Sequence, residues 1–398
     1  MKIRSMLICA SLSLVALGRN FDAHELNRLV YPFWLSGQMD YESILLTRDN
    51  EQVSGSLLFT PKSTVKIWNY DFSAEYSFGK DFEVQGRQTI FPEDTIAPSL
   101  TPEQLYPPTK DGAVERVFPI NGGFVLAPDG AWMHLRQVKA SYQFDQSEWE
   151  GPRPGYKLDR LPCTKKMMEE KQSLNILFFG DSLTEGAHAS RNRGVAPMLP
   201  GWDELVVYAL KQQYGGPVEY LNAAIGGTTS EWGMKTVKEL AENPPESFLF
   251  DERKRIDRTK KKLLAFQPDL AVIAFGMNGA FSAAEYRTHI EGIISAIRQH
   301  HSDAEFILIK SMLPNGCWKG QRLMKEYWGI LDRIAESGER IITVDIGPVH
   351  EAILERKTYA DLSSNHVNHP DDFLVRVYAQ VILSSLIDFP KNETEFMQ

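Results

Sequence analysis

A serine hydroxyl and a histidine ring are the side chains of this sequence best suited to catalytic chemistry. Ser182 stands in a Gly-Asp-Ser-Leu tetrapeptide directly after a short apolar run, and His369 precedes a proline and two acidic residues. A free serine is a weak nucleophile that needs a neighbouring base, and histidine is the most frequent such base. If the two side chains meet, the serine can attack an acyl carbon while the histidine takes its proton. Taken alone, each residue also fits a helix cap or a structural role.

Two further segments offer hydrogen-bond donors for a developing oxyanion. Asn222–Thr229 contains the adjacent glycines Gly226 and Gly227, which let the backbone approach a ligand closely and direct an N–H group toward it. Asn278, between a methionine and a glycine, offers a side-chain amide. Each feature alone is common in tight turns. Together with the serine and the histidine they supply a nucleophile, a base and two kinds of donor, which is the set that acyl transfer requires.

The elements that must bring these residues together alternate between strand and helix. Short apolar runs predict five buried strands, over Leu174–Phe179, Val218–Leu221, Leu270–Phe275, Phe306–Ile309 and Ile341–Ile346. Helical patterns separate or follow them, over Asp203–Gln213, Ala283–His300, Gln321–Glu336 and Asp371–Leu386. This alternation predicts an α/β domain with a parallel sheet covered on both faces. Because the working groups of such sheets lie beyond the carboxyl ends of the strands, we expect the four groups to meet at that edge.

The first part of the chain has a different pattern. Residues 25–150 contain many short β-like runs separated by turns and by a proline-rich stretch, among them Ser56–Phe59, Val65–Trp68 and Trp132–Leu135. This pattern predicts an all-β sandwich domain. Residues 151–173, rich in glycine and proline, are predicted to link it to the α/β domain over 174–389.

The extreme N-terminus has the pattern of a secretory signal peptide. Lys2 and Arg4 precede an apolar stretch from Met6 to Leu17, and small residues suited to cleavage follow within residues 1–18. The stretch is too short to cross a bilayer, and no other segment is apolar enough to do so. We therefore expect a secreted or periplasmic protein if residues 1–18 are removed. A cytoplasmic protein with a buried N-terminal element is the alternative.

Charge and cysteine content exclude several other classes of function. The formal net charge of −9 argues against a nucleic-acid binder, which needs clustered Lys and Arg, and fits a neutral or polar substrate. The basic run over residues 253–262 is interpreted as the solvated face of a helix. The three cysteines lack metal or redox spacing, so no metal or cofactor is predicted. Cys163 and Cys317 are expected either to form one disulfide or to remain two free thiols.

The four motifs resemble the conserved blocks of the SGNH (GDSL-type) hydrolase superfamily. The resemblance covers roughly residues 174–389 and implies a flavodoxin-like, three-layer α/β/α domain with a five-stranded parallel sheet. It implies that Ser182 is the nucleophile, that His369 is the base, and that the oxyanion donors are Ser182, Gly227 (or Gly226) and Asn278. A β-sandwich ahead of such a domain is similar to the two-domain carbohydrate acetyl esterases, in which a jelly roll precedes the hydrolase.

The sequence departs from the family pattern at two positions. Gly279 stands where the third block usually has Asp, and His366 stands where an Asp usually precedes the histidine by three residues. The carboxylate that orients the imidazole in a triad is therefore missing from its expected place. This favours a Ser-His dyad in which a backbone carbonyl holds the imidazole. Asp361 is the possible substitute acid, and Asp371 and Asp372 are further candidates.

The sequence thus predicts a carboxylic ester hydrolase that removes acetyl or another short acyl group from a carbohydrate. Trp202, Trp232 and Trp318 lie near the motifs and are interpreted either as packing residues or as flat faces for sugar rings. No long apolar lid segment is evident, which disfavours long-chain esters. The alternatives are a lysophospholipase or thioesterase, and a catalytically inactive glycan-binding protein. The expected partner is a small-molecule or glycan ester, and the oligomeric state stays open.

Overall fold

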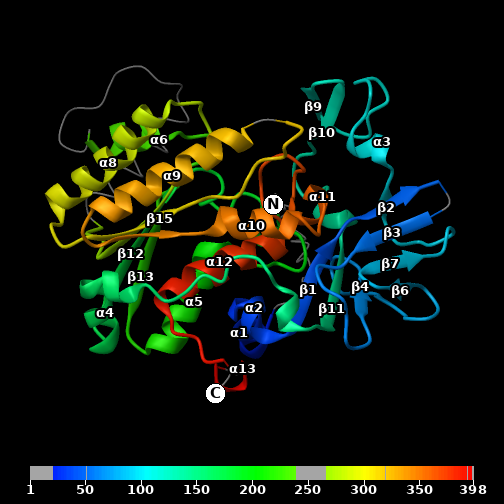
Figure 1. Cartoon of the computed structure of the whole chain (residues 1–398), viewed down its shortest axis with the longest axis horizontal. Helices are drawn as coiled ribbons and strands as arrows, with labels where there is room; N and C mark the ends of the chain where they lie inside the picture. Colours follow the sequence, from blue (N-terminus) through cyan, green and yellow to red (C-terminus); the bar gives the residue numbers. More distant parts are fainter. Residues whose placement is uncertain (1–20, 51, 239–265, 319, 392, 397–398) are drawn as a thin grey trace, which may run out of the picture.

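A computed structural model of the chain describes residues 21–50, 52–238, 266–318, 320–391 and 393–396. The predicted signal peptide and the basic run over 253–262 lie outside these residues. The described chain contains a β-rich part followed by an α/β part, and the two lie side by side along the long axis of the molecule (Figure 1).

The β-rich part contains several short-stranded sheets. One sheet has the order β1-β11-β4-β5, a second has the order β6-β7-β3-β2-β8, and β9 and β10 form a separate hairpin. All their pairings are antiparallel except that of β2 with β8. The strands are β1 (Gln38–Ile44), β2 (Leu46–Asp49), β3 (Gln52–Ser56), β4 (Lys66–Trp68), β5 (Glu75–Tyr76), β6 (Glu83–Gln85), β7 (Gln88–Phe91), β8 (Ser99–Leu100), β9 (Val117–Ile120), β10 (Gly123–Leu126) and β11 (Val138–Gln143).

The α/β part is built on a five-stranded parallel sheet in the order β13-β12-β14-β15-β16. Its strands are β12 (Leu174–Gly180), β13 (Val218–Asn222), β14 (Leu270–Ala274), β15 (Glu305–Ile309) and β16 (Ile341–Val344). Four of the five are almost wholly buried, which explains their continuous apolar sequences. The chain order reverses between β12 and β14, and in such sheets ligands bind at this switch point.

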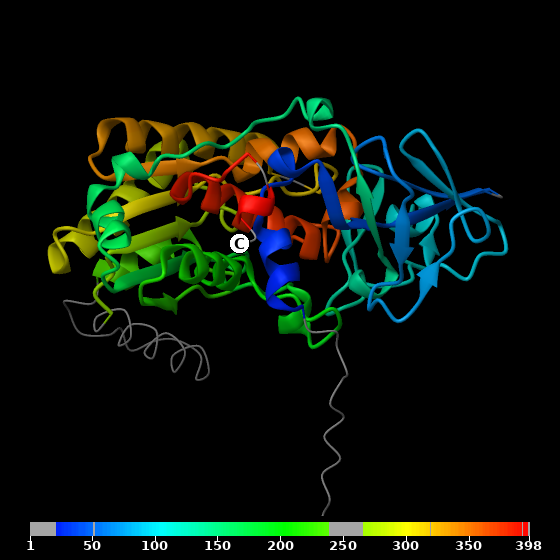
Figure 2. The ribbon, with the colours of Figure 1, turned by 90° about the horizontal axis from the view of Figure 1, so that it is seen from below.

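Helices cover both faces of this sheet. α6, α8 and α9 pack against one another on one face, while α5 and α12 pack together on the other, with α1 against both of them (Figure 2). The α-helices of the described chain are α1 (Ala23–Val30), α2 (Phe33–Ser36), α3 (Pro102–Leu105), α4 (Pro162–Glu169), α5 (Trp202–Tyr214), α6 (Ser230–Lys238), α8 (Ala283–His300), α9 (Gln321–Ser337), α10 (Ile346–Leu354), α11 (Tyr359–Leu362), α12 (Asp372–Leu386) and α13 (Glu393–Phe396). The predicted three-layer α/β/α architecture, preceded by a β-rich region, is therefore confirmed.

Three local predictions for strands are wrong. Only Ser56 of the predicted run Ser56–Phe59 lies in a strand, at the end of β3, and Leu57–Phe59 continue as irregular chain. Trp132–Leu135 forms a turn that leads into a short 3-10 helix over His134–Arg136. The apolar run from Ile341 ends as a strand at Val344, and Ile346 already begins α10. Leu57–Phe59 and most of Ile341–Ile346 are apolar because they are buried, and burial alone does not distinguish a strand from another buried conformation. In the Trp132–Leu135 run, Leu135 is exposed.

Candidate active site

The three loops that follow β12, β13 and β14 meet at the carboxyl edge of the sheet. Gly180 ends β12 against the carbonyl of Ala274 in β14, and a Cβ on Gly180 would lie 2.3 Å from that oxygen. Only glycine allows this close approach. Asp181 then joins two of the loops, because its carboxylate accepts the N–H groups of Leu183 (3.1 Å) and Met277 (3.3 Å). Burial raises the pKa of Asp181 to about 7, against the effect of these N–H donors.

Ser182 and His369 meet at this edge. The Oγ of Ser182 lies 2.8 Å from Nε2 of His369, across 187 positions of sequence. Ser182 is 8% exposed, so the hydroxyl is shielded but open at the edge. The two residues that the sequence singles out as nucleophile and base are thus in hydrogen-bond contact.

The predicted oxyanion donors lie around the serine. The N–H of Gly226 donates to Oε2 of Glu185 (2.8 Å), whereas the N–H groups of Ser182 and Gly227 have no acceptor within the described residues. A Cβ on Gly226 would lie 3.5 Å from Cβ of Ser182, so the second loop touches the first. The amide Nδ2 of Asn278 donates to the carbonyl of Thr228 (3.1 Å), next to Gly227. Of the two glycines, Gly227 is the one whose N–H is available.

The second ring nitrogen of His369 has a partner that the sequence analysis missed. Nδ1 of His369 lies 2.7 Å from Nδ2 of Asn365. The Oδ1 atom of Asn365 accepts the backbone N–H groups of Val367, Asn368 and His369, each at 3.0 Å. An Asn whose side chain closes a turn onto the following residues is a recurrent local motif, and here it also reaches the histidine four positions on. An Asn four residues before the predicted base was therefore the sequence signal that could have identified Asn365 as its partner.

The carboxylates considered for the third position of a triad lie elsewhere. The Oδ2 of Asp361 accepts the N–H and the hydroxyl of Thr358 (2.8 Å each), and its Oδ1 accepts the N–H of Leu45 (2.8 Å). Asp371 caps α12 through the N–H of Leu374, and Asp372 accepts the N–H of Ser190. Among the described residues, no carboxylate forms a hydrogen bond or ion pair with His369.

His366, at the place of the usual acid, points away from His369. Its backbone is left-handed, with φ of 58°, and its Nε2 lies 3.2 Å from the Tyr106 hydroxyl of the β-rich part. Burial lowers the pKa of His366 to about 4. The position that could hold an orienting carboxylate therefore contacts the other part of the molecule instead.

The surroundings of His369 disfavour its protonated form. Burial, with a smaller contribution from the positive charge of Arg193, lowers the pKa of His369 to about 4, and Asp129 opposes this weakly. The ring of His188 stacks on the His369 ring, with centroids 4.1 Å apart and planes 10° from parallel. Burial also lowers the pKa of His188. Both rings are neutral at pH 7, which is the state that a general base requires.

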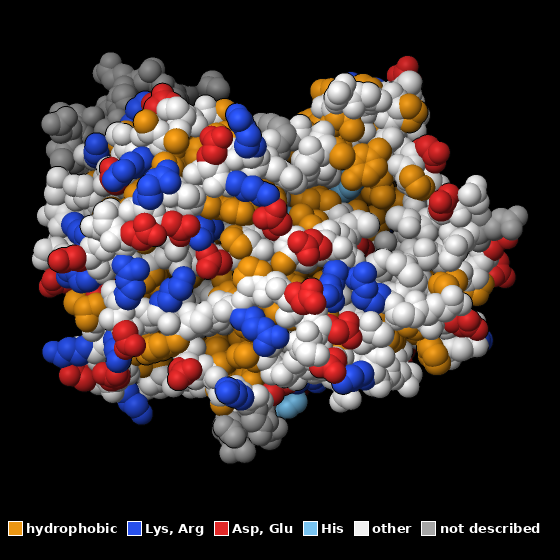
Figure 3. All heavy atoms as spheres, viewed as in Figure 1, with side chains coloured by type: hydrophobic (Ala, Val, Ile, Leu, Met, Phe, Trp, Pro, Cys, Tyr) orange, Lys and Arg blue, Asp and Glu red, His pale blue; other side chains and the backbone are white. Residues whose placement is uncertain are grey.

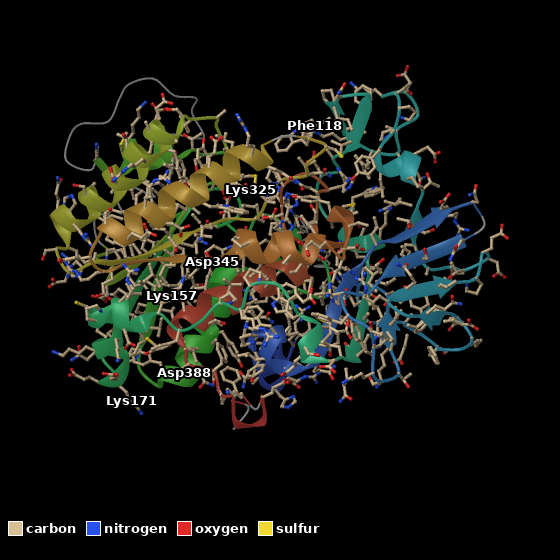
Figure 4. The ribbon with its side chains drawn as sticks, viewed as in Figure 1. Phe118, Lys157, Lys171, Lys325, Asp345 and Asp388 are labelled. Carbon is tan, nitrogen blue, oxygen red and sulfur yellow. The ribbon has the colours of Figure 1, made fainter. Side chains whose placement is uncertain are left out.

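The three tryptophans differ in burial, because Trp202 is buried whereas Trp232 and Trp318 are partly exposed. Trp202 is buried and donates to the Leu183 carbonyl, and Trp232 packs on Phe179. Trp318 is partly exposed and stacks on Phe118 of the β9–β10 hairpin, with ring centroids 6.0 Å apart. Figure 4 shows Phe118 reaching from this hairpin toward the α/β part.

The aromatic pair is connected to the loop that carries His369. The N–H of Trp318 donates to the carbonyl of Asn315, whose Nδ2 donates to the carbonyl of His366. Figure 3 shows apolar side chains gathered beside the hairpin, at the notch between it and the helices. The aromatic pair thus lies at the junction of the two parts, three residues along the chain from Asn315.

Within the described residues, no group of three His, Cys, Asp or Glu side chains could hold a metal ion. None of the helices searched there is long and apolar enough to span a membrane. Cys163 and Cys317 are both free, so of the two possibilities for these cysteines the structure has the pair of thiols.

Comparisons with solved structures found similar chains. Chains of a two-domain esterase (CEX) active on acetylated mannans align with 20% and 21% identity and TM-scores of 0.42 and 0.43. The alignments cover 62% and 60% of this chain but only 53% and 57% of the esterase chains. The psychrotrophic esterase EstA from Pseudoalteromonas sp. aligns at 17% identity and a TM-score of 0.37, over 53% of this chain and 96% of its own.

No curated protein matches the chain in sequence. A family model does match: that of the GDSL-like lipase/acylhydrolase family, over residues 178–372. This range begins in β12, ends at the start of α12, and includes Ser182, Gly227, Asn278 and His369. The α/β part of the chain is therefore a domain of the GDSL-like lipase/acylhydrolase family.

Proposed function

We propose that the protein is a serine esterase that removes short acyl groups, acetyl above all, from a carbohydrate. The observation that carries this proposal is the 2.8 Å contact between Oγ of Ser182 and Nε2 of His369 at the switch point of the sheet. A nucleophile and base in hydrogen-bond contact, with free N–H groups beside them, form the arrangement that acyl transfer needs.

In the proposed reaction, Ser182 Oγ bonds to the acyl carbon as its proton passes to His369 Nε2. The N–H groups of Ser182 and Gly227 and the amide of Asn278 stabilise the tetrahedral oxyanion, and each such donor is worth about 3 kcal/mol. The carbon–oxygen bond to the sugar then breaks, and His369 returns the proton to the leaving alcohol. Water attacks the acyl-enzyme by the same steps, which releases the acid and restores the serine.

A carbohydrate substrate is supported by the aromatic pair of Phe118 and Trp318. Both rings are partly exposed, and the Trp318 loop is hydrogen-bonded through Asn315 to the segment that carries His369. Aromatic faces with a few polar groups are typical of small-molecule sites, and they suit the C–H faces of a sugar ring. Because the two-domain esterase (CEX) is active on acetylated mannans, an acetylated mannan is the first polymer to assay.

The test compares ester hydrolysis by the wild type, Ser182→Ala and Ser384→Ala. Ser384 is a matched control, because it is a buried serine of α12 whose hydroxyl, within the described part of the chain, donates to the Gln380 carbonyl of its own helix. We expect Ser182→Ala to lower turnover of p-nitrophenyl acetate by roughly 100-fold or more, while Ser384→Ala keeps it within about threefold. Release of acetate from acetylated oligosaccharides would be measured in parallel by acid–base titration.

The same assay separates the alternatives. A preference for octanoate over acetate would point to a lysophospholipase or thioesterase. Among the described residues no carboxylate bonds to His369, and this favours one other function, a glycan-binding protein without turnover. Hydrolysis by the wild type no faster than by Ser182→Ala, on every ester including acetylated sugars, would replace the esterase proposal with that one.

A further inference from the structure

The contact between Asn365 and His369 decides where the imidazole carries its proton. A neutral imidazole has one N–H donor and one acceptor nitrogen. Nδ1 of His369 faces the amide nitrogen of Asn365 at 2.7 Å, and an amide nitrogen can only donate. Nδ1 must then be the acceptor, and the single proton lies on Nε2.

The orientation of the Asn365 amide is fixed by its own loop. Its Oδ1 accepts three consecutive backbone N–H groups, those of Val367, Asn368 and His369, all at 3.0 Å. Turning the amide over would place its NH₂ group against three donors and leave each of them without an acceptor. Nδ2 also donates to Oδ1 of Asn368 at 3.0 Å, a contact compatible with this orientation, while the three backbone donors are what fix it.

We infer that Asn365 is a positioning residue that holds His369 in the tautomer with its proton on Nε2. In this tautomer the Nε2–H group donates to Oγ of Ser182, 2.8 Å away, and no lone pair is available for the serine proton. The resting site therefore has the right residues in contact but the proton on the wrong nitrogen. This inference rests on the proposed function, since it concerns the base of that reaction.

Hydrolysis then proceeds from the minor tautomer, in which Nε2 is free and Nδ1–H faces the Asn365 amide. The imidazolium formed as the serine attacks has N–H groups on both nitrogens, so its Nδ1–H also faces the N–H group of the Asn365 amide instead of an acceptor. In a serine protease triad, replacing Asp by Asn lowers kcat about 10⁴-fold through the wrong tautomer. The wild-type protein is accordingly a slow esterase whose rate is limited by Asn365.

A single substitution completes the triad. In Asn365→Asp, one carboxylate oxygen still accepts hydrogen bonds from the three backbone N–H groups. The other oxygen takes the place of Nδ2 and accepts a hydrogen bond from a protonated Nδ1 of His369. The Asn368 amide can rotate to donate to the new oxygen, since the contact to Asn365 is its only side-chain hydrogen bond in the described residues. Asn368→Asp is the matched control, because it adds the same charge to the same loop without touching Nδ1.

The experiment combines kinetics with ¹⁵N NMR of the histidine rings, in which protonated and unprotonated nitrogens have distinct shifts. The nine histidines are labelled, and the His369 signals are assigned by their loss in His369→Gln. We expect a protonated Nε2 in the wild type and in Asn368→Asp, and a protonated Nδ1 in Asn365→Asp. We expect kcat for p-nitrophenyl acetate to rise at least tenfold in Asn365→Asp and to change less than threefold in Asn368→Asp.

A wild-type spectrum with the proton on Nδ1 would overturn the inference, whatever the kinetics. So would an Asn365→Asp protein that is folded, has the proton on Nδ1, and is no faster than the wild type while Ser182-dependent hydrolysis is measurable. If no variant hydrolyses any ester, the proposed function fails, but the NMR spectra still decide the tautomer. The two failures are therefore distinguishable.

Discussion

The imidazole of His369 lies among neighbours that oppose its positive charge. Burial removes the water that would stabilise an imidazolium, and the cation of Arg193 disfavours it further. The neutral ring of His188 stacks on the imidazole and supplies no counter-charge. Nδ1 of His188 is itself buried without a partner in the described residues. The base is thus kept neutral by its surroundings over a wider pH range than an exposed histidine.

This environment predicts an unusual pH dependence of activity. The histidine must be neutral to act as a base, so kcat/KM falls as the pH drops through its pKa, which burial lowers to about 4. At pH 5.5 the enzyme should keep about 97% of its plateau kcat/KM, whereas a histidine at its ordinary pKa of about 6.5 would leave only about 9%. The measurement is kcat/KM for p-nitrophenyl acetate from pH 4 to 8, with circular dichroism at each pH to check folding. An acid limb centred between pH 6 and 7 would contradict it.

At the scale of elements, the predictable parts are those with local signals of their own. α8 begins and ends where its pattern predicts, because Ser282 and Glu285 form a capping box at its start. Four of the buried strands are also found to within one residue at each end. β16 is the exception, because the apolar run continues past Asp345 into α10.

The residues of the candidate site could be predicted from the sequence, but the hydrogen bonds between their side chains could not. The chain positions of Ser182 and His369 at loop starts indicate the edge where they meet. The direction of a side chain after a turn depends on tertiary contacts, and no sequence pattern shows that Tyr106 draws His366 away from His369. The role of Asn365 depends on which end of its amide faces the ring, which the three backbone donors decide.

The role of Asp361 is to hold elements together, because its carboxylate caps α11 and accepts the N–H of Leu45 in the β-rich part. Asp361→Ala removes the acceptor of two backbone N–H groups, and we expect it to destabilise the protein by about 2 kcal/mol. The kcat of the folded variant should stay within about threefold of the wild type. Thermal unfolding and p-nitrophenyl acetate kinetics on one preparation would check both. A folded Asp361→Ala protein without activity would instead make this residue part of the catalytic apparatus.

At the scale of the whole molecule, the two parts share one interior. Their buried side chains form a single hydrophobic cluster that runs from the β-rich strands to the parallel sheet. A smaller cluster joins Ala360 of the α11 segment to Leu45, Leu100 and Leu126. The loop that carries His369 follows this segment, so docking of the β-rich part fixes the base as well as the fold.

The ion pair of Lys357 with Glu42 lies at the junction of the two parts. Breaking this pair tests how much the junction contributes to stability and to the position of His369. The two side chains are fully buried, with Nζ 2.7 Å from Oε1, and Nζ also donates to the carbonyls of Ser43 and Ser56. Removing one member of a buried pair leaves a charge without a partner, at a cost of about 3–5 kcal/mol. Lys357→Met should therefore lower the thermal midpoint by several degrees and expose the junction to limited proteolysis.

Two controls make this prediction specific to the buried pair. Lys325→Met breaks an exposed pair with Glu351 and should change stability by less than about 1 kcal/mol. Adding Glu42→Gln to Lys357→Met removes the unpaired charge and should restore part of the lost stability, which a double-mutant cycle would measure. If Lys357→Met has the same melting temperature as the wild type, the junction is held by the shared apolar core alone. If it melts earlier and also loses esterase activity below its melting temperature, the β-rich part keeps His369 in place as well as stabilising the fold.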